Sequence, residues 1–195
     1  QVNQLAVLPE ASGLNDGQMQ QIAREFNFSE TTFVFPPEQG QTKRVRIFTP
    51  TSEVPFAGHP NLGTAFTLYR NGYLGDVQPP LQVVFEEEAG LVPVTITNLD
   101  NGYPFFELQA PTPLSLGAEI NVEAVGQALS LSVSAIRSER HRPQLASVGL
   151  PFLIVKLKDR EVLEKARPNL DAFQVLQAQG VAMTHLYVNS EDEFD

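Results

Sequence analysis

The glutamate at position 30 occupies a place where a carboxyl group could carry a proton. It lies between a stretch with helical spacing of apolar residues and the β-branched, aromatic segment of residues 31–35, which is typical of a strand. A carboxyl that is partly buried at such a junction has a raised pKa, and near neutral pH it can both accept and donate a proton. The alternative is an exposed glutamate that begins an edge strand.

A second candidate lies in the sequence Gly58-His59-Pro60-Asn61. Proline suits the first turn of a helix, and Gly58 permits close approach of the backbone or a positive φ. Backbone N–H groups that are free at a helix start bind anions, including carboxylates. His59 can add a hydrogen bond or a proton relay. The alternative is a histidine that only caps a tight turn.

Other reactive groups are scarce in the sequence. The chain has no cysteine, which excludes a thiolate nucleophile, a disulfide and a zinc site with cysteine ligands. It also lacks the Gly-x-Ser-x-Gly elbow of the common serine hydrolases and the glycine motifs that bind phosphates. His141 and His185 have no metal-ligand spacing, so we expect no metal site.

Charge and composition narrow the function further. The 195 residues carry a net charge of −10, with 42% hydrophobic and 18% charged residues. This composition is that of an ordinary globular protein, and an acidic chain repels phosphate backbones, so we expect no nucleic-acid partner. No apolar run reaches about 18 residues, and the N-terminus shows no signal-peptide pattern. We therefore expect no membrane span and a cytoplasmic location, which the lack of cysteine also fits.

The elements that must position the candidate groups follow from the residue pattern. We expect strands at residues 2–8, 31–35, 44–49, 81–85, 91–97, 105–109, 145–149, 152–157 and 186–189, and helices at residues 17–26, 62–69, 122–129 and 172–178. Asn15 or Asp16 can cap the first helix, and residues 50–60 read as a long turn. Glu86-Glu87-Glu88 predicts a solvated turn, and the arginines around His141 predict a surface loop (Arg137, Arg140, Arg142).

The order of these elements suggests a repeat. Strand, helix and strand follow one another near the N-terminus, and the same order recurs after a proline-containing linker at residues 110–115. We therefore expect two domains, residues 1–110 and 111–195, related by an internal structural repeat. The alternative is that strand, helix and strand form a common order without further meaning.

Three blocks of sequence, taken together, resemble the signature of the PhzF phenazine-biosynthesis family. They are residues 26–34 (FNFSETTFV), 44–50 (RVRIFTP) and 55–65 (PFAGHPNLGTA), and residues 89–94 and 149–152 are similar to it as well. The resemblance implies an α+β, diaminopimelate-epimerase-like fold. That fold has two pseudo-symmetric halves, each a curved sheet around a central helix. Residues 111–195 would form an incomplete second half.

The resemblance also implies a function. Glu30 matches the general acid/base of the family, and Ser29, Gly58, His59 and Asn61 fall where its substrate site lies. An isomerase of this kind moves a carbon-bound proton in a small carboxylate substrate without a cofactor, and the family suggests a homodimer. Related epimerases use a cysteine pair, which this chain lacks.

The chain departs from the family at both ends. The second motif of the family, of the type Glu-Asp-Pro-Ala-Thr-Gly-Ser-Ala, does not occur before the last residues, Glu193-Phe194-Asp195. We therefore expect a chain that is truncated at both ends. An alternative is a non-catalytic or split family member that binds a small molecule, or one that needs a partner chain.

Overall fold

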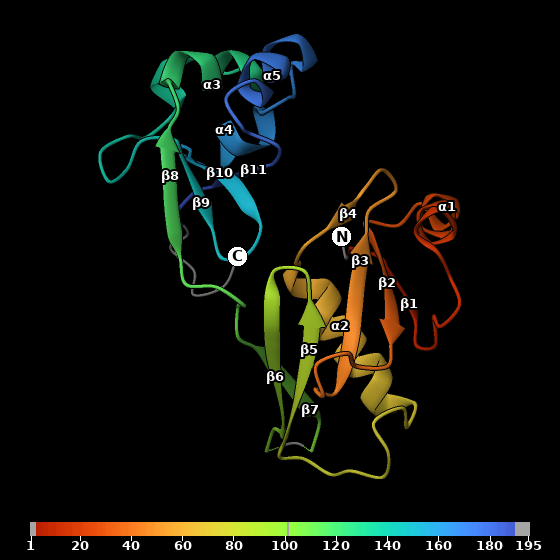
Figure 1. Cartoon of the computed structure of the whole chain (residues 1–195). Helices are drawn as coiled ribbons and strands as arrows, with labels where there is room; N and C mark the ends of the chain where they lie inside the picture. Colours follow the sequence, from red (N-terminus) through yellow and green to blue (C-terminus); the bar gives the residue numbers. More distant parts are fainter. Residues whose placement is uncertain (1–2, 101, 190–195) are drawn as a thin grey trace. The chain divides into compact units, whose positions relative to one another are not determined.

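The computed structural model describes residues 3–100 and 102–189. The chain divides into two compact units, Gln1–Thr112 and Pro113–Asp195 (Figure 1). The division falls two residues after the boundary expected from the sequence. Residue 2 of the first expected strand and the terminal residues 193–195 lie outside the described part of the chain.

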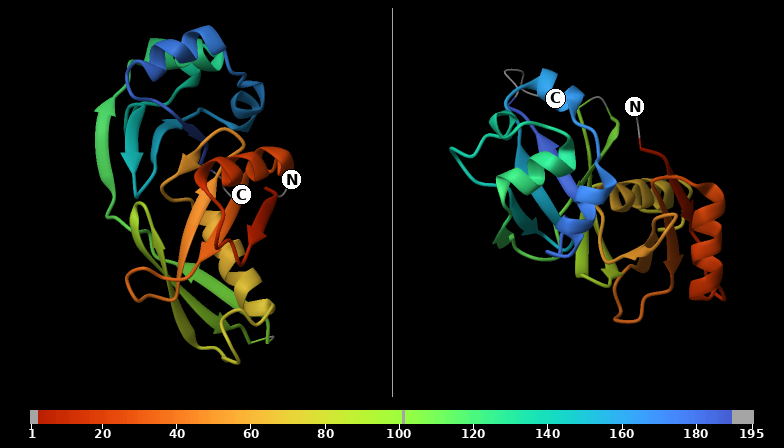
Figure 2. Two further views of the ribbon diagram at one scale, coloured as in Figure 1. Left: turned by 45° about the vertical axis from the view of Figure 1, so that its right-hand side comes forward. Right: turned by 90° about the horizontal axis from the view of Figure 1, so that it is seen from above.

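Within its described residues, the first unit forms a seven-stranded mixed sheet in the order β1-β2-β3-β5-β6-β7, with β4 paired to β3. Its elements are β1 (Leu5–Leu8), α1 (Asp16–Phe26), β2 (Glu30–Phe35), β3 (Lys43–Phe48), β4 (Glu53–Val54), α2 (Gly58–Arg70), β5 (Leu81–Glu87), β6 (Gly90–Asn98) and β7 (Pro104–Leu108). The helices α1 and α2 lie on opposite sides of β2 and β3 (Figures 1 and 2).

Helix α1 begins where the sequence places its cap. The Asn15 side chain accepts a hydrogen bond from the Gln18 backbone, and the Gln18 side chain accepts one from the Asn15 backbone. This capping box satisfies two N–H groups that the helix leaves free. The apolar face of α1 packs, through Met19 and Ala23, in a buried cluster with Phe33 of the sheet.

Helix α2 starts earlier than the sequence analysis expected. Residues 58–60 were assigned to a long turn, but they form the first turn of the helix, with Pro60 at its third position, where no N–H is required. The two-residue strand β4 was also missed within that turn. The buried face of α2 contacts β1, β2, β6 and β7, so this helix is the centre around which the sheet packs. At Gly63 a Cβ would overlap the Leu5 side chain, which shows how closely α2 approaches β1.

The second unit is a four-stranded sheet, within its described residues, in the order β11-β10-β9-β8. Its elements are β8 (Ser115–Glu119), α3 (Val122–Leu129), the 3-10 helix η1 (Val133–Ala135), β9 (Gln144–Ser147), β10 (Pro151–Lys156), α4 (Arg160–Lys165), α5 (Leu170–Gln177) and β11 (Thr184–Tyr187). Its core joins α3 and α5 to β10 through residues such as Val125, Leu176 and Val155. The elements β8, η1 and α4 were not expected from the sequence.

The expected repeat is present in the topology. In the first unit, β1 and β2 are parallel, with Leu5 opposite Glu30 and α1 between the two strands in the chain. In the second unit, β10 and β11 are parallel, with α4 and α5 between them. A parallel pair needs such a crossover connection, so each unit is built around the same strand, helix and strand motif.

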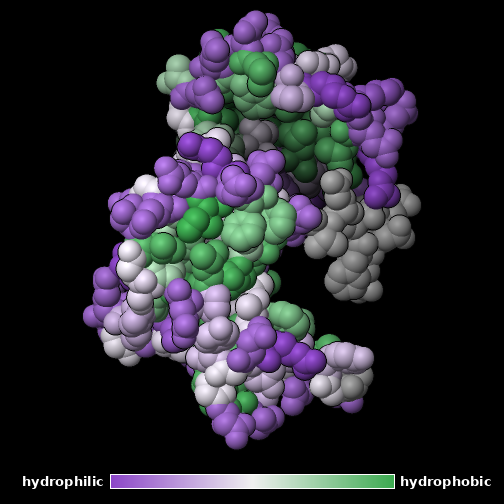
Figure 3. Space-filling view, turned by 90° about the vertical axis from the view of Figure 1, so that its right-hand side faces the viewer, coloured by the Kyte–Doolittle hydropathy of each residue, from purple (hydrophilic) through white to green (hydrophobic). Residues whose placement is uncertain are grey.

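The surface carries scattered apolar side chains. Figure 3 shows the side on which α1 lies, where a hydrophobic area is bordered by hydrophilic side chains. Phe26, at the end of α1, is one of the large apolar residues that remain exposed. No helix in the described part of the chain is long and apolar enough to cross a membrane.

Candidate active site

Glu30 is the first residue of β2, and its side chain is largely withdrawn from solvent. In a strand, residues two apart point to the same face, so Glu30 lies on the same side as Thr32. The hydroxyl of Thr32 is hydrogen-bonded to Thr64 of α2, so this face is the one that α2 covers. Only 20% of the Glu30 side chain is exposed. Burial raises the pKa of this carboxyl above its ordinary value of 4.5.

His59 is the second residue of α2 and lies directly beside Glu30. Its Nε2 atom is 3.3 Å from the Oε2 atom of Glu30, although the alignment is not that of a hydrogen bond. His59 partly opposes the effect of burial and lowers the pKa of Glu30. Both residues were expected at the site from the sequence, and the structure brings them together.

The Oε2 atom of Glu30 is therefore a buried acceptor without a hydrogen-bond donor among the described residues. Buried acceptors are normally satisfied, and an exception calls for an explanation. An acceptor that receives a proton from a bound molecule would account for it. The imidazole beside it is 40% exposed, so this corner of the first unit is open to solvent.

The start of α2 adds an anion-binding feature next to this pair. No hydrogen bond in the described residues uses the backbone N–H of Gly58 or His59, and Ala57 provides no side-chain cap. A Cβ at Gly58 would meet no atom within 4 Å, and its φ lies outside the left-handed region. Gly58 thus keeps space open over the helix start, rather than supplying a positive φ. Free N–H groups and the helix dipole together favour a carboxylate here.

The other two residues expected at the site, Ser29 and Asn61, differ in their exposure to solvent. Ser29 is exposed and directly precedes β2, beside Glu30 in the chain. The Asn61 side chain is completely buried, and its Nδ2 atom donates a hydrogen bond of 3.0 Å to the Ala57 carbonyl. This contact gives the Asn61 side chain a structural part in the first turn of α2. Substrate contact through either residue stays a prediction.

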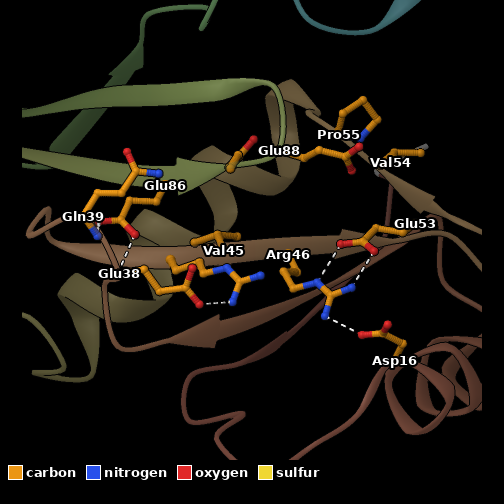
Figure 4. Close-up of a pocket in the computed structure, with 12 residues that line it drawn as sticks. Asp16, Glu38, Gln39, Val45, Arg46, Glu53, Val54, Pro55, Glu86 and Glu88 are labelled. Atoms are coloured by element: carbon orange, nitrogen blue, oxygen red, sulfur yellow. Dashed lines mark hydrogen bonds and ion pairs between the residues drawn. The ribbon is translucent and has the colours of Figure 1, made fainter.

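A separate cavity of about 500 Å³ lies over β3 and the end of β5, and neither Glu30 nor His59 lines it. Its charged groups are largely paired with one another (Figure 4). Arg46 donates to both carboxylate oxygens of Glu53, at 2.7 and 2.6 Å, and to Asp16 at 2.7 Å. The hydrogen bonds to Glu53 and Asp16 raise the pKa of Arg46 further. We interpret this group as a structural ion network.

The expectation of a solvated turn at Glu86-Glu87-Glu88 is wrong for two of the three residues. Glu86 is 3% exposed, and its carboxylate accepts hydrogen bonds from the backbone of Glu38, Gln39 and Gln41. Both carboxyl oxygens of Glu87 are buried. The reason is that β5 extends to Glu87, so that neighbouring side chains point to opposite faces of a covered sheet. Glu88 alone is exposed.

The described residues contain no group of three or more histidine, aspartate or glutamate side chains that could hold a metal ion. This corner of the first unit brings together a partly buried carboxyl, an imidazole and a free helix start. Such a set can move a proton on a molecule whose anionic group is held by the helix.

The known proteins that this chain is similar to are phenazine biosynthesis-like proteins and isomerases. A family model described as phenazine biosynthesis-like protein matches residues 1–194. An uncharacterized isomerase of Mesorhizobium japonicum is 38% identical over 177 residues, which are 89% of this chain and 57% of that protein. The trans-2,3-dihydro-3-hydroxyanthranilate isomerase of Pseudomonas aeruginosa is 38% identical over 154 residues, which are 77% of this chain and 52% of that enzyme.

The fold has close counterparts among solved structures. A protein from Pseudomonas aeruginosa, described as a predicted epimerase, superposes with a TM-score of 0.81 at 30% identity. The match covers 94% of this chain and 64% of that one. With 57% and 52% of the two isomerases covered, the chain spans about half the length of the curated relatives it matches.

Proposed function

The chain belongs to the PhzF family of phenazine biosynthesis-like proteins, and we propose that it carries the general acid/base of a cofactor-independent isomerase. The resemblance noted in the sequence is thereby confirmed, as is the α+β, diaminopimelate-epimerase-like fold. The proposed reaction moves a carbon-bound proton in a small carboxylate substrate.

One observation carries the proposal: the Oε2 atom of Glu30 is a buried acceptor with no hydrogen-bond donor among the described residues, and it lies 3.3 Å from the Nε2 atom of His59. Burial raises the pKa of Glu30, and His59 limits the rise. A carboxyl with a pKa closer to neutrality exchanges protons in both directions more readily than one at 4.5. This balance suits a group that must remove a proton and return it.

The reaction would proceed in two steps at one carboxyl. Ionised Glu30 removes a proton from a substrate carbon, and the electron pair of that C–H bond moves into the conjugated system of the substrate. The protonated Glu30 then delivers the proton to another carbon, so the enzyme returns to its starting state. The substrate carboxylate rests on the N–H groups of Gly58 and His59 throughout.

The names of the relatives are consistent with this substrate class. The Pseudomonas aeruginosa relative is named for an isomerisation of trans-2,3-dihydro-3-hydroxyanthranilate, which is a cyclic carboxylate. We propose a substrate of the same chemical class for the protein to which this chain belongs. We further propose that this protein is cytoplasmic and that it forms a homodimer. Light scattering on the purified full-length protein would test the homodimer.

The decisive experiment compares wild type with Glu30→Gln in deuterium oxide, using the full-length protein and trans-2,3-dihydro-3-hydroxyanthranilate as the probe. Wild type should incorporate deuterium at carbon, and Glu30→Gln should lose at least about 100-fold in rate, the lower range for a general acid/base. Glu25→Gln, a change of the same kind at an exposed residue of α1, is the matched control. Exchange that continues unchanged in Glu30→Gln would overturn the assignment of Glu30. Binding of the probe by wild type without any exchange would favour a binding protein instead.

A further inference from the structure

Glu87 is a buried carboxyl that the proposed reaction does not use. Both of its carboxyl oxygens lie out of contact with solvent, and neither has a hydrogen-bond partner in the described structure. Its position at the end of β5 places it next to the amide of Asn61 in the first turn of α2. The Oδ1 atom of Asn61 is likewise buried and without a donor.

The orientation of the Asn61 amide is fixed by its other contact. Its Nδ2 atom donates to the Ala57 carbonyl at 3.0 Å. Rotating the amide by half a turn would bring Oδ1 against that carbonyl, and two acceptors would then face each other. Three buried acceptors thus lack a donor: Oδ1 of Asn61 and both oxygens of Glu87. A hydrogen bond from Glu87 to Oδ1 of Asn61 can form only if one of the Glu87 oxygens carries a proton.

Among the described residues that line the cavity beside Glu87, no cation is free to compensate its negative charge. The cavity that Glu87 borders contains Arg46, which is bonded to Glu53 of β4 and Asp16 of α1, and Arg44, which is paired with Glu38. The remaining charged residues that line the cavity, Glu86 and Glu88, are themselves acidic. His59 of α2 faces Glu30. A negative charge on Glu87 would thus be buried without a partner, which is costly.

We propose that Glu87 is a neutral carboxylic acid in the folded protein at neutral pH, and that it forms a two-bond acid–amide pair with Asn61. In this pair the O–H of Glu87 donates to Oδ1 of Asn61, and the second N–H of Nδ2 donates to the other oxygen of Glu87. Burial raises the pKa of Glu87 to about 8, against a smaller lowering by the Asn61 amide, in agreement with this arrangement.

The pair makes Glu87 a positioning residue for the start of α2. In this pair Glu87 is hydrogen-bonded to Asn61, and Asn61 donates to the Ala57 carbonyl. Gly58 and His59, which follow Ala57, supply the free N–H groups, and His59 also supplies the imidazole. When Glu87 ionises above pH 8, the donor to Oδ1 is lost and a negative charge appears behind the helix start. This consequence for turnover rests on the proposed function, whereas the protonation of Glu87 does not.

The first test is a carbon-13 NMR titration of the glutamate carboxyl signals of the chain, with Glu87 assigned by its loss in Glu87→Gln. We expect a midpoint near pH 8 for Glu87. A midpoint below pH 7 would mean that Glu87 is mostly ionised at neutral pH, and it would overturn the proposal. If Glu87→Gln fails to fold, assignment through the backbone of the wild-type protein gives the same reading. Neither measurement needs substrate, so the protonation state of Glu87 can be determined even if the isomerase proposal fails.

The second test measures the positioning role in the full-length protein. The rate constant kcat/KM of wild type should fall at least fivefold between pH 7 and pH 9. Glu87→Gln, which is neutral at every pH and can still donate to Oδ1, should remove that alkaline decline. Glu87→Leu, which has no donor, should raise KM at all pH values. An identical alkaline decline in wild type and Glu87→Gln would overturn the positioning role while leaving the titration result standing.

Discussion

The hydroxyl groups of Thr32 and Thr64 share a hydrogen bond of 2.8 Å that joins β2 to α2 inside the first unit. Both side chains are completely buried. Thr32 follows Glu30 on the same face of its strand, and Thr64 belongs to the helix that begins with Gly58 and His59. The bond therefore fixes the strand that carries the carboxyl to the helix that carries the imidazole.

Replacing one partner of this bond should cost more than replacing both. Thr32→Val leaves the Thr64 hydroxyl buried without a partner, so we expect the free energy of unfolding to fall by about 1–3 kcal/mol. In the double variant with Thr64→Val, two apolar groups of similar shape meet, and much of the loss should be recovered. Urea denaturation of all four proteins measures the coupling. Strictly additive losses would show that the bond contributes nothing.

Removal of the imidazole should shift the titration of the carboxyl. His59 lowers the pKa of Glu30, so His59→Asn should raise that pKa further and move the ionisation of Glu30 to higher pH. The carbon-13 signal of the Glu30 carboxyl reports the change directly. His185→Asn, at an exposed histidine of the second unit, should leave it unchanged. A Glu30 midpoint that moves to lower pH in His59→Asn would contradict the pairing.

A methyl group at Gly58 should block the helix start without disturbing the fold. An added Cβ meets no protein atom within 4 Å, so the melting temperature of Gly58→Ala should match wild type within experimental error. The same Cβ would stand over the N–H groups proposed to hold the carboxylate, so KM should rise at least tenfold in the full-length protein. Gly17→Ala, at the start of α1, is the control for a change at a helix start. Unchanged KM in Gly58→Ala would place the anion elsewhere.

Glu86 should make the protein sensitive to acid. Burial opposes its ionisation, but backbone hydrogen bonds from Glu38, Gln41 and Gln39 prevail and lower its pKa below 4.5. A lowered folded-state pKa adds stability above the ordinary pKa, and that stability is lost as the pH falls through the folded value. Glu86→Gln should therefore be less stable than wild type at pH 7, with the difference shrinking below pH 4.5.

Hydrogen exchange locates this effect in the loop between β2 and β3. The amides of Gln39 and Gln41 should exchange faster in Glu86→Gln than in wild type, since they lose an ionised acceptor. Glu88→Gln removes a charge of the same kind from an exposed neighbour and should alter neither exchange nor acid stability. Equal acid sensitivity of both variants would show that net charge, and not the loop, is responsible.

Local sequence signals predicted the elements that carry the candidate pair. The helix capped at Asn15 and the strand that follows Glu30 were expected from apolar spacing and β-branched residues, and both are present. The start of α2 was placed too late because residues 50–60, which are rich in proline and glycine, were assigned to a turn, although Pro60 fits the third position of a helix, where no N–H is required. Strand β8 was missed because all its residues are exposed, so no alternation marks it.

The glutamate run shows what a sequence cannot reveal. Three identical residues in a row carry no alternation of polarity, so the pattern contains no sign of the sheet faces. Only the register of β5 against its neighbours turns Glu86 toward the loop, buries Glu87 and leaves Glu88 in solvent. The proximity of Glu30 to His59 is of the same kind, since it depends on packing between a strand and a helix that are separate elements of the chain.

The short stretch that holds Glu30, Thr32, His59 and Thr64 has a consequence for chimaeric proteins. All four residues lie between positions 30 and 64, well inside the unit that ends at Thr112. In a library of recombined family members, a crossover after position 112 would pass the carboxyl and imidazole on together with the bond that aligns them. Crossovers between positions 32 and 59 would combine partners from different parents, and the proposed proton transfer should be weakest in those chains.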